Sequence, residues 1–116
     1  MARTRQDPWS LLPVGASAFY ILLALAEGER HGASIAAEVE ETTAGVMRML
    51  PGALYRYLKG MVVDGWIVEH EAEDNDGRRK YYRLTPWGRR VAQAEAQRLN
   101  TVVRLARSRR LLPAGA

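Results

Sequence analysis

The sequence predicts a mainly α-helical fold with one small β-hairpin, arranged as a winged helix-turn-helix that carries a long C-terminal dimerisation helix. Three observations predict this class. Three helical patterns follow one another closely, two short runs of β-forming residues come next, and an uninterrupted helical pattern follows them. Closely spaced helices are typical of helix-turn-helix modules, and a hairpin directly after the third helix is typical of a wing.

Length and composition limit the classes of protein to consider. The chain has 116 residues, of which 47% are apolar, so one domain with a modest core is expected. It contains no cysteine, which excludes a disulfide framework and a thiolate metal site. No apolar run approaches the roughly 18 residues of a membrane span, and the N-terminal stretch lacks the apolar segment of a signal peptide. A cytoplasmic location is therefore expected.

Positive charge is concentrated towards the C-terminal end. The net charge is +4, but residues 1–85 hold ten Lys and Arg against twelve Asp and Glu, a net of −2. Residues 86–116 hold seven Arg and the single acid Glu95, a net of +6. Such a balance favours anionic partners, either nucleic acid or an anionic membrane surface, and does not choose between them.

Residues 1–13 are expected to form an N-terminal arm, because Pro8 and Pro13 interrupt any helix there. Its apolar side chains can dock on the same subunit or on a second one; they are Trp9, Leu11 and Leu12.

Two helices are predicted next. The first covers Ala16–Glu27 and is apolar enough to be central to the core. The second opens near Gly32–Ser34 and runs to about Thr43. The residues expected on the buried sides of these two helices are Ala18, Ile21, Leu22, Leu25, Ile35, Ala36 and Val39.

A third helix is predicted within Leu50–Gly65, with Pro51 at its first position and Gly65 as a left-handed stop. Its buried stripe is expected to be Leu54, Leu58, Met61 and Val62. Its outer face is small, basic and aromatic, and carries Gly52, Ala53, Arg56 and Lys59, with Tyr55 on the flank. Such a face suits the major groove of DNA. The alternative is an ordinary amphipathic helix whose cations are solvated.

The stretch after Gly65 is predicted to be a β-hairpin. Trp66–Glu71 and Lys80–Thr85 are rich in β-formers, and the connection contains Asn, Asp and Gly. The tip is expected to carry three cations, Arg78, Arg79 and Lys80. As a wing, the hairpin would bring them to phosphates or to the minor groove. The alternative is a solvated loop, because acidic residues lie close by in the sequence.

The last helix is predicted to begin with Thr85 as N-cap and to continue to Arg109 or Arg110. Small and apolar residues recur along it in a heptad pattern, at Ala92, Ala96, Leu99, Val103 and Ala106. This seam favours a homodimer, and the alternative is packing on the first helix of the same chain. The chain thus divides into an arm (1–13), a winged helix-turn-helix domain (14–84), and a dimerisation helix with a short basic tail (85–116).

Three segments together resemble the PadR family of bacterial transcriptional regulators: AFYILLALAEGERHG, LPGALYRYLKGMVVDGWI and RRKYYRLTPWGRR. The resemblance covers about residues 14–110, and the single C-terminal helix is similar to the short-tailed branch of the family. It implies a homodimer that usually represses transcription from pseudo-palindromic operators on double-stranded DNA. It also implies that a small aromatic effector can release the DNA, as in some members.

Two positions depart from the family pattern. Ala33 stands where the family usually has an aromatic residue, and Ala53 stands where it usually has Ser or Thr. Ala53 removes a hydroxyl that could bond a phosphate or a base, although its methyl group could meet a thymine methyl. His31 can either touch a phosphate at the start of the second helix or serve a local structural role.

Other functions have weaker support in the sequence. The two histidines, His31 and His70, are not accompanied by a thiol nucleophile, a glycine-rich phosphate loop or a spaced metal-ligand set, so no enzyme, cofactor or metal is predicted. The alternative function is a winged-helix module that contacts another protein or a membrane surface. The membrane alternative is suggested by the basic amphipathic C-terminal end, where Arg104, Arg107, Arg109 and Arg110 lie beside Leu111 and Leu112. The alanine-rich seam is not bulky enough to favour a membrane.

Overall fold

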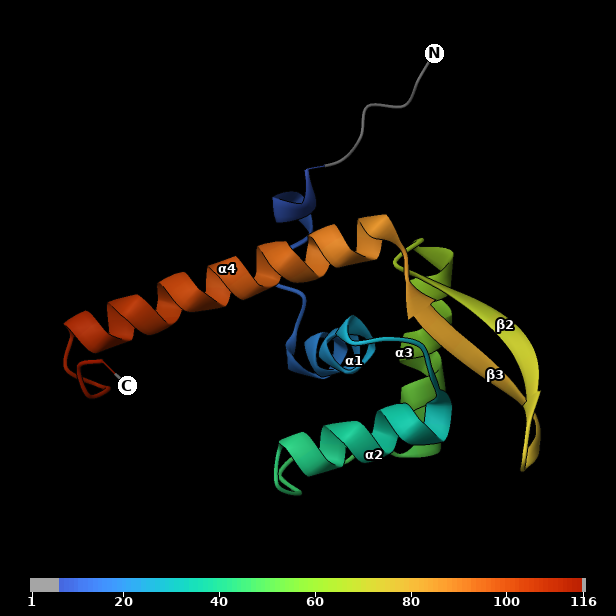
Figure 1. Cartoon of the computed structure of the whole chain (residues 1–116). Coiled ribbons are helices and arrows are strands. Elements are labelled where there is room, and N and C mark those ends of the chain that lie inside the picture. The colour runs from blue at the N-terminus through green and yellow to red at the C-terminus, as the bar shows by residue number, and fades with distance from the viewer. Residues whose placement is uncertain (1–6, 116) are drawn as a thin grey trace, which may run out of the picture.

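The computed structural model describes residues 7–115 and shows a helical core, a three-stranded antiparallel sheet and a long C-terminal helix (Figure 1). In chain order the elements are η1 Pro8–Leu11, α1 Ala16–Ala26, β1 Arg30–His31, α2 Gly32–Thr42, α3 Pro51–Val63, β2 Ile67–Asp74, β3 Gly77–Leu84 and α4 Pro86–Ser108. The predicted mainly helical winged helix-turn-helix with a long C-terminal helix is confirmed. Within residues 7–115, no helix combines the length and the apolar character needed to cross a membrane.

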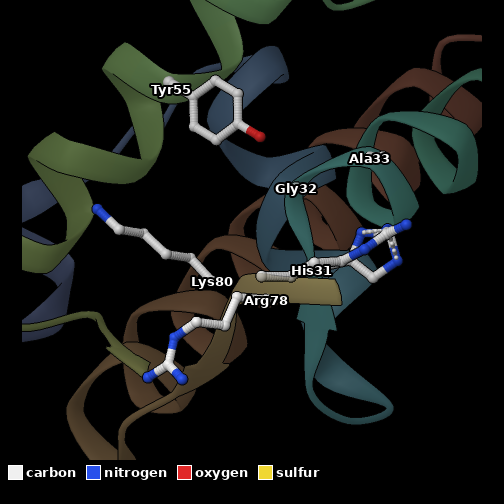
Figure 2. Close-up of a pocket in the computed structure, with 7 residues that line it drawn as sticks. His31, Gly32, Ala33, Tyr55, Arg78 and Lys80 are labelled. Carbon is white, nitrogen blue, oxygen red and sulfur yellow. Dashed lines mark hydrogen bonds between the residues drawn. The ribbon is translucent and has the colours of Figure 1, made fainter. Parts of the chain in front are cut away.

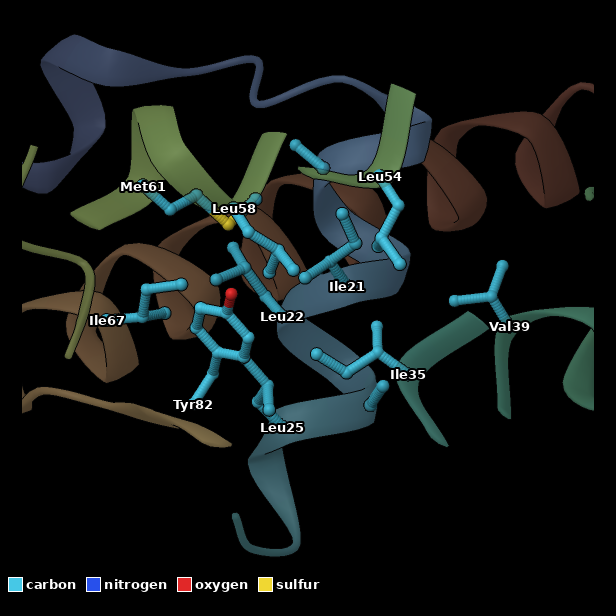
Figure 3. Packing of buried hydrophobic residues seen from close by; sticks show 12 residues of the cluster. Ile21, Leu22, Leu25, Ile35, Val39, Leu54, Leu58, Met61, Ile67 and Tyr82 are labelled. Atoms are coloured by element: carbon cyan, nitrogen blue, oxygen red, sulfur yellow. The ribbon is translucent and has the colours of Figure 1, made fainter. Parts of the chain in front are cut away.

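Helix α1 lies at the centre of the core and packs against α2, α4 and β3. Its side chains Ile21, Leu22 and Leu25 are at most 1% exposed and meet side chains from α2, α3 and the sheet (Figure 3). Burial of such side chains is the dominant favourable term in folding. In α2, Ile35 and Val39 are buried as expected.

Helix α3 begins at Pro51, as predicted, and its polypeptide turns at Gly65, where φ is +78°. Leu54, Leu58 and Met61 are buried on one face (Figure 3). Val62 was predicted in the same stripe but is only partly buried. The opposite face of α3 is therefore left to solvent.

The sheet has the order β1-β3-β2. Strand β1 was not predicted, because two residues carry no periodicity; it pairs His31 with Tyr81 in β3. The β2–β3 hairpin is longer than predicted and closes through a two-residue turn, Asn75 and Asp76. The expectation that Arg78–Lys80 form the tip was wrong, since cross-strand pairing continues to Gly77 and places these residues within β3.

The base of the hairpin and the start of α4 are in close backbone contact. Thr85 caps α4 by accepting the N–H of Gly88 at 2.9 Å, and its hydroxyl donates to the carbonyl of Gly65 at 2.6 Å. Gly88 is buried, and a Cβ at this position would overlap the carbonyl oxygen of Trp66. Only glycine fits here without moving the backbone.

The one buried charged residue in the described part of the chain is Glu95, which is 2% exposed. Arg98 donates two hydrogen bonds to its carboxylate, at 2.7 and 2.9 Å, and the N–H of Val14 lies 3.4 Å from it. The Arg98 hydrogen bond lowers the pKa of Glu95 against the opposing effect of burial. The pair joins α4 to the segment before α1, and η1 packs against α4 of the same chain.

We expect Gly88→Ala to lower the free energy of unfolding by about 3 kcal/mol, because the new Cβ must displace the Trp66 carbonyl. Urea denaturation followed by circular dichroism measures this. The matched control is Gly60→Ala in α3, where a Cβ meets nothing within 4 Å and alanine should stabilise the helix by up to about 1 kcal/mol. Equal stabilities for the two variants would contradict the proposed packing.

Candidate nucleic-acid interface

A hollow of about 360 Å³ lies between the start of α2, the first half of α3, and β3 (Figure 2). It brings together four of the residues predicted to bind DNA, and its lining consists of His31, Gly32, Ala33, Tyr55, Arg78, Arg79 and Lys80. The N-terminus of an α-helix favours anions because its first N–H groups lack partners within the helix. With the cations of β3 opposite, this hollow is suited to a phosphate group.

Tyr55 reaches from α3 towards the first turn of α2 (Figure 2). A Cβ on Gly32 would lie 2.5 Å from the Tyr55 hydroxyl oxygen, so the glycine allows the tyrosine to come this close. The side chain of Tyr55 remains 49% exposed and borders a second hollow as well. Ala33 is exposed at the rim, where its small side chain leaves the opening wide.

The outer face of α3 carries cations that form no ion pair within residues 7–115. Gly52, Arg56 and Lys59 are exposed, and Ala53 is partly buried. Among the described residues, neither Arg56 nor Lys59 has an ion-pair partner within 4.0 Å. Their charge is therefore available to an anionic partner.

The second hollow, of about 460 Å³, separates α3 from the hairpin. Lys59 and Val63 border it from α3, and Glu69, Lys80 and Tyr82 border it from the strands. Because side chains alternate along a strand, the charged residues of β2 and β3 that share this face are Glu69, Glu71, Glu73, Arg78 and Lys80.

The cations on the α3-facing side of the hairpin are paired with carboxylates of the same hairpin. Nε of Arg78 donates to Oε1 of Glu71 at 3.0 Å, and Nζ of Lys80 lies 4.0 Å from Oε2 of Glu69. The wing is therefore less basic than its sequence indicates.

Arg79 lies between Arg78 and Lys80 in the strand and is held by its neighbours. Its guanidinium donates to Asp76 at 2.8 Å, lies 3.5 Å from Asp74, and is 2.9 Å from Nε2 of His31. Nδ1 of His31 in turn accepts the N–H of Ser34 and so caps α2. The carboxylates of Asp74 and Asp76 thus hold Arg79 within the hairpin, with its guanidinium against the ring of His31 at the start of α2.

Tyr81 and Asp74 complete this cluster of contacts. The Tyr81 hydroxyl donates to Asp74 at 2.5 Å, and its ring packs between His31 and His70. The hydrogen bond from Tyr81 is the largest cause lowering the pKa of Asp74, followed by the backbone N–H of Asp76. This cluster could not be predicted from the sequence, because its members are brought together only by the strand register.

The geometry of helix, hollow and wing is accompanied by a match to a known family. The model of the transcriptional regulator PadR-like family matches residues 21–94. This chain belongs to the PadR-like family. The resemblance seen in the sequence is thereby confirmed. No curated protein matches the chain by sequence.

Solved structures have the same fold. A PadR family transcription regulator from hypervirulent Clostridium difficile R20291 is 25% identical with a TM-score of 0.73, over 81% of this chain and 97% of that one. A transcriptional regulator from Clostridium thermocellum is 23% identical with a TM-score of 0.69, over 78% and 89% of the two chains. Bacillus subtilis PadR in complex with operator DNA is 23% identical with a TM-score of 0.60, over 66% of this chain and 45% of that one.

In this PadR-like protein the second half of α4 extends beyond the core (Figure 1). Its apolar side chains Val102, Val103 and Leu105 are 48%, 37% and 54% exposed. Val103 belongs to the predicted heptad seam. Of the other residues of that seam, Ala96 is exposed, and Leu99 and Ala106 are partly buried. Ala92 already packs on the protomer's own core.

We expect Tyr81→Phe to raise the pKa of Asp74 towards its ordinary value of 3.8, because the variant removes the largest hydrogen bond to that carboxylate. A carboxyl group whose pKa is lower in the folded protein than in the unfolded chain stabilises the fold at pH values above the unfolded-state pKa. That stabilisation is lost as the pH falls through the folded-state pKa. The variant should therefore lose stability at neutral pH and much less at the acid end.

The measurement is a carbon-detected NMR titration of Asp74. Tyr57→Phe is the matched control, since Tyr57 is 40% exposed and its hydroxyl makes no hydrogen bond within residues 7–115. An Asp74 pKa that stays the same in both variants would show that the Tyr81 hydroxyl is not its partner.

Proposed function

We propose that this PadR-like protein is a sequence-specific DNA-binding transcriptional regulator, which represses transcription as a homodimer on a pseudo-palindromic operator. The observation that carries the proposal is the outer face of α3, where Arg56 and Lys59 are exposed and form no ion pair with any residue that the structure describes, while the opposite face is buried. The structure of the similar Bacillus subtilis PadR with operator DNA supports it.

In this proposal α3 lies in the major groove with its N-terminus towards the bases. Gly52 and Ala53 let the backbone come close, and Arg56 reaches a base edge. Lys59 and Tyr55 contact phosphates on either side of the groove. The wing adds phosphate contacts from Arg78 and Lys80, and Arg79 contributes by holding the hairpin in place.

The homodimer is proposed to form through the heptad seam of α4, Ala92, Ala96, Leu99, Val103 and Ala106. Support comes from the apolar side chains that the distal half of α4 exposes in the protomer. Soluble monomers rarely leave such side chains adjacent to one another in water. Most homodimers have two-fold symmetry, which a pseudo-palindromic operator matches.

A small aromatic effector is proposed to bind between α1 and α4. A cavity of about 370 Å³ lies there, bordered by Phe19, Tyr20, Leu23 and Leu99 and by the Glu95–Arg98 pair. Ligand sites are typically apolar hollows of this size with a few polar groups that fix orientation. Because the cavity adjoins the seam of α4, a bound molecule could change how the two subunits meet.

We expect Arg56→Ala to relax base preference at one operator position per half-site, at a cost of about 1–3 kcal/mol. Lys59→Ala should instead weaken every duplex alike and reduce the salt dependence of binding. Selection of bound sequences from random duplex DNA, followed by salt titrations on the selected operator, measures both effects.

Both substitutions lie on the exposed face of α3, so thermal stability should change by no more than about 0.5 kcal/mol. If both variants bind the selected operator as the parent does, α3 is not the reading helix. A winged helix used for protein contact would then be the better account.

We expect Val103→Asp to convert the dimer to a monomer, because it places an unpaired charge in the apolar contact between two α4 helices. Val103 is 37% exposed in the protomer, so the protomer itself should stay folded. Thr101→Asp on the same helix adds the same charge away from the seam and should remain dimeric. Sedimentation equilibrium distinguishes the outcomes, and a Val103→Asp variant that stays dimeric would remove this stretch from the interface.

A further inference from the structure

We infer that Glu71 determines how well the protein discriminates its operator from other DNA, by holding Arg78 until a DNA phosphate displaces the carboxylate. The inference rests on the proposed function and adds to it a residue that limits binding. It concerns the α3-facing side of the β2–β3 hairpin.

The contact itself is short and open to solvent. Nε of Arg78 lies 3.0 Å from Oε1 of Glu71, and the two side chains are 65% and 52% exposed. In the register of the hairpin, Glu71 faces Lys80 directly and Arg78 diagonally. An exposed pair of this kind contributes little to the stability of a fold. The main effect of the pair is therefore to make the positive charge of Arg78 less available to an anionic partner.

Arg78 and Lys80 line the hollow beside Tyr55, on the side where DNA would lie along α3 (Figure 2). Both have a carboxylate as a neighbour, since Glu69 lies 4.0 Å from Lys80. This side of the hairpin thus carries three carboxylates against two cations, whereas the cations of α3 are unpaired among the described residues. Among the described residues, unpaired positive charge therefore lies on α3, whereas the α3-facing side of the hairpin has a net charge of −1.

This arrangement affects operator and random DNA unequally. Binding to random sequence depends almost wholly on phosphate contacts, so a neutralised wing weakens it directly. On the operator, base contacts from α3 hold the duplex against the hairpin, and a phosphate there can displace Glu71 from Arg78. A feature that weakens the complex with random DNA more than the complex with the operator increases specificity for the operator.

The test compares Glu71→Gln with Glu73→Gln. Glu73 lies on the same strand and face and is directly opposite Arg78 in the register, but it makes no ion pair in the part of the chain that the structure describes. Both variants therefore remove one carboxylate beside Arg78, and only Glu71→Gln also removes the observed contact. Affinities are measured on the selected operator and on a random-sequence duplex over a range of salt concentrations, after thermal melts have shown that both variants are folded.

We expect Glu71→Gln to raise affinity for the random duplex about threefold to tenfold more than Glu73→Gln does, with a salt slope steeper by about one contact. Affinity for the operator should rise less, so the ratio of the two affinities falls. In the Arg78→Ala background the excess effect of Glu71→Gln should disappear.

Two results would overturn the inference while leaving the proposed function intact. In one, the parent prefers its operator but Glu71→Gln behaves as Glu73→Gln does. In the other, the excess persists in the Arg78→Ala background. A parent protein that shows no preference for any selected duplex overturns the proposed function, and the inference with it.

Discussion

Gly88, in the first turn of α4, packs directly on the backbone carbonyl of Trp66, which lies between the end of α3 and the start of β2. Helix α3 ends next to this contact, the hairpin begins and ends there, and α4 starts there. The N–H of Trp66 donates to the Met61 carbonyl at 2.9 Å as α3 ends, and the N–H of Thr85 donates to the Trp66 carbonyl at 3.0 Å as the hairpin closes. With Gly88 pressed on that carbonyl, the directions of the three elements are fixed relative to one another. The exposed face of α3, the wing and the distal part of α4 are thus held on one rigid frame.

A second set of contacts fixes the far end of the hairpin. Arg79 and Tyr81 connect it, through His31, to the cap of α2, while the other face of the same strands carries the Glu71–Arg78 pair. The two faces of the hairpin thus have different roles: one holds the wing in position, and the other sets the charge that the wing presents. In the proposed complex with DNA, the three consecutive cations of β3 should therefore not contribute equally to binding.

Much of the fold could be predicted from the sequence, because local signals and burial agree along it. Pro51 and Gly65 bracket α3, Thr85 caps α4, and the spacing of apolar residues identifies the buried faces of α1 and α3. The site could be predicted only in part. The pairing of β1 with β3 and the cluster around Tyr81 depend on strand register, which composition does not reveal. The cations of the hairpin were visible in the sequence, but the carboxylates that neutralise them are seven and eleven residues away.

Methylation interference on the selected operator reports which groove α3 occupies and how many copies of the protein bind. Guanine N7 lies in the major groove and adenine N3 in the minor groove. The account predicts that methylated guanines block binding in two symmetric clusters, separated by about one or two helical turns of roughly 10 base pairs each. A single cluster, or interference confined to adenines in the minor groove, would contradict a two-fold dimer that reads DNA with α3.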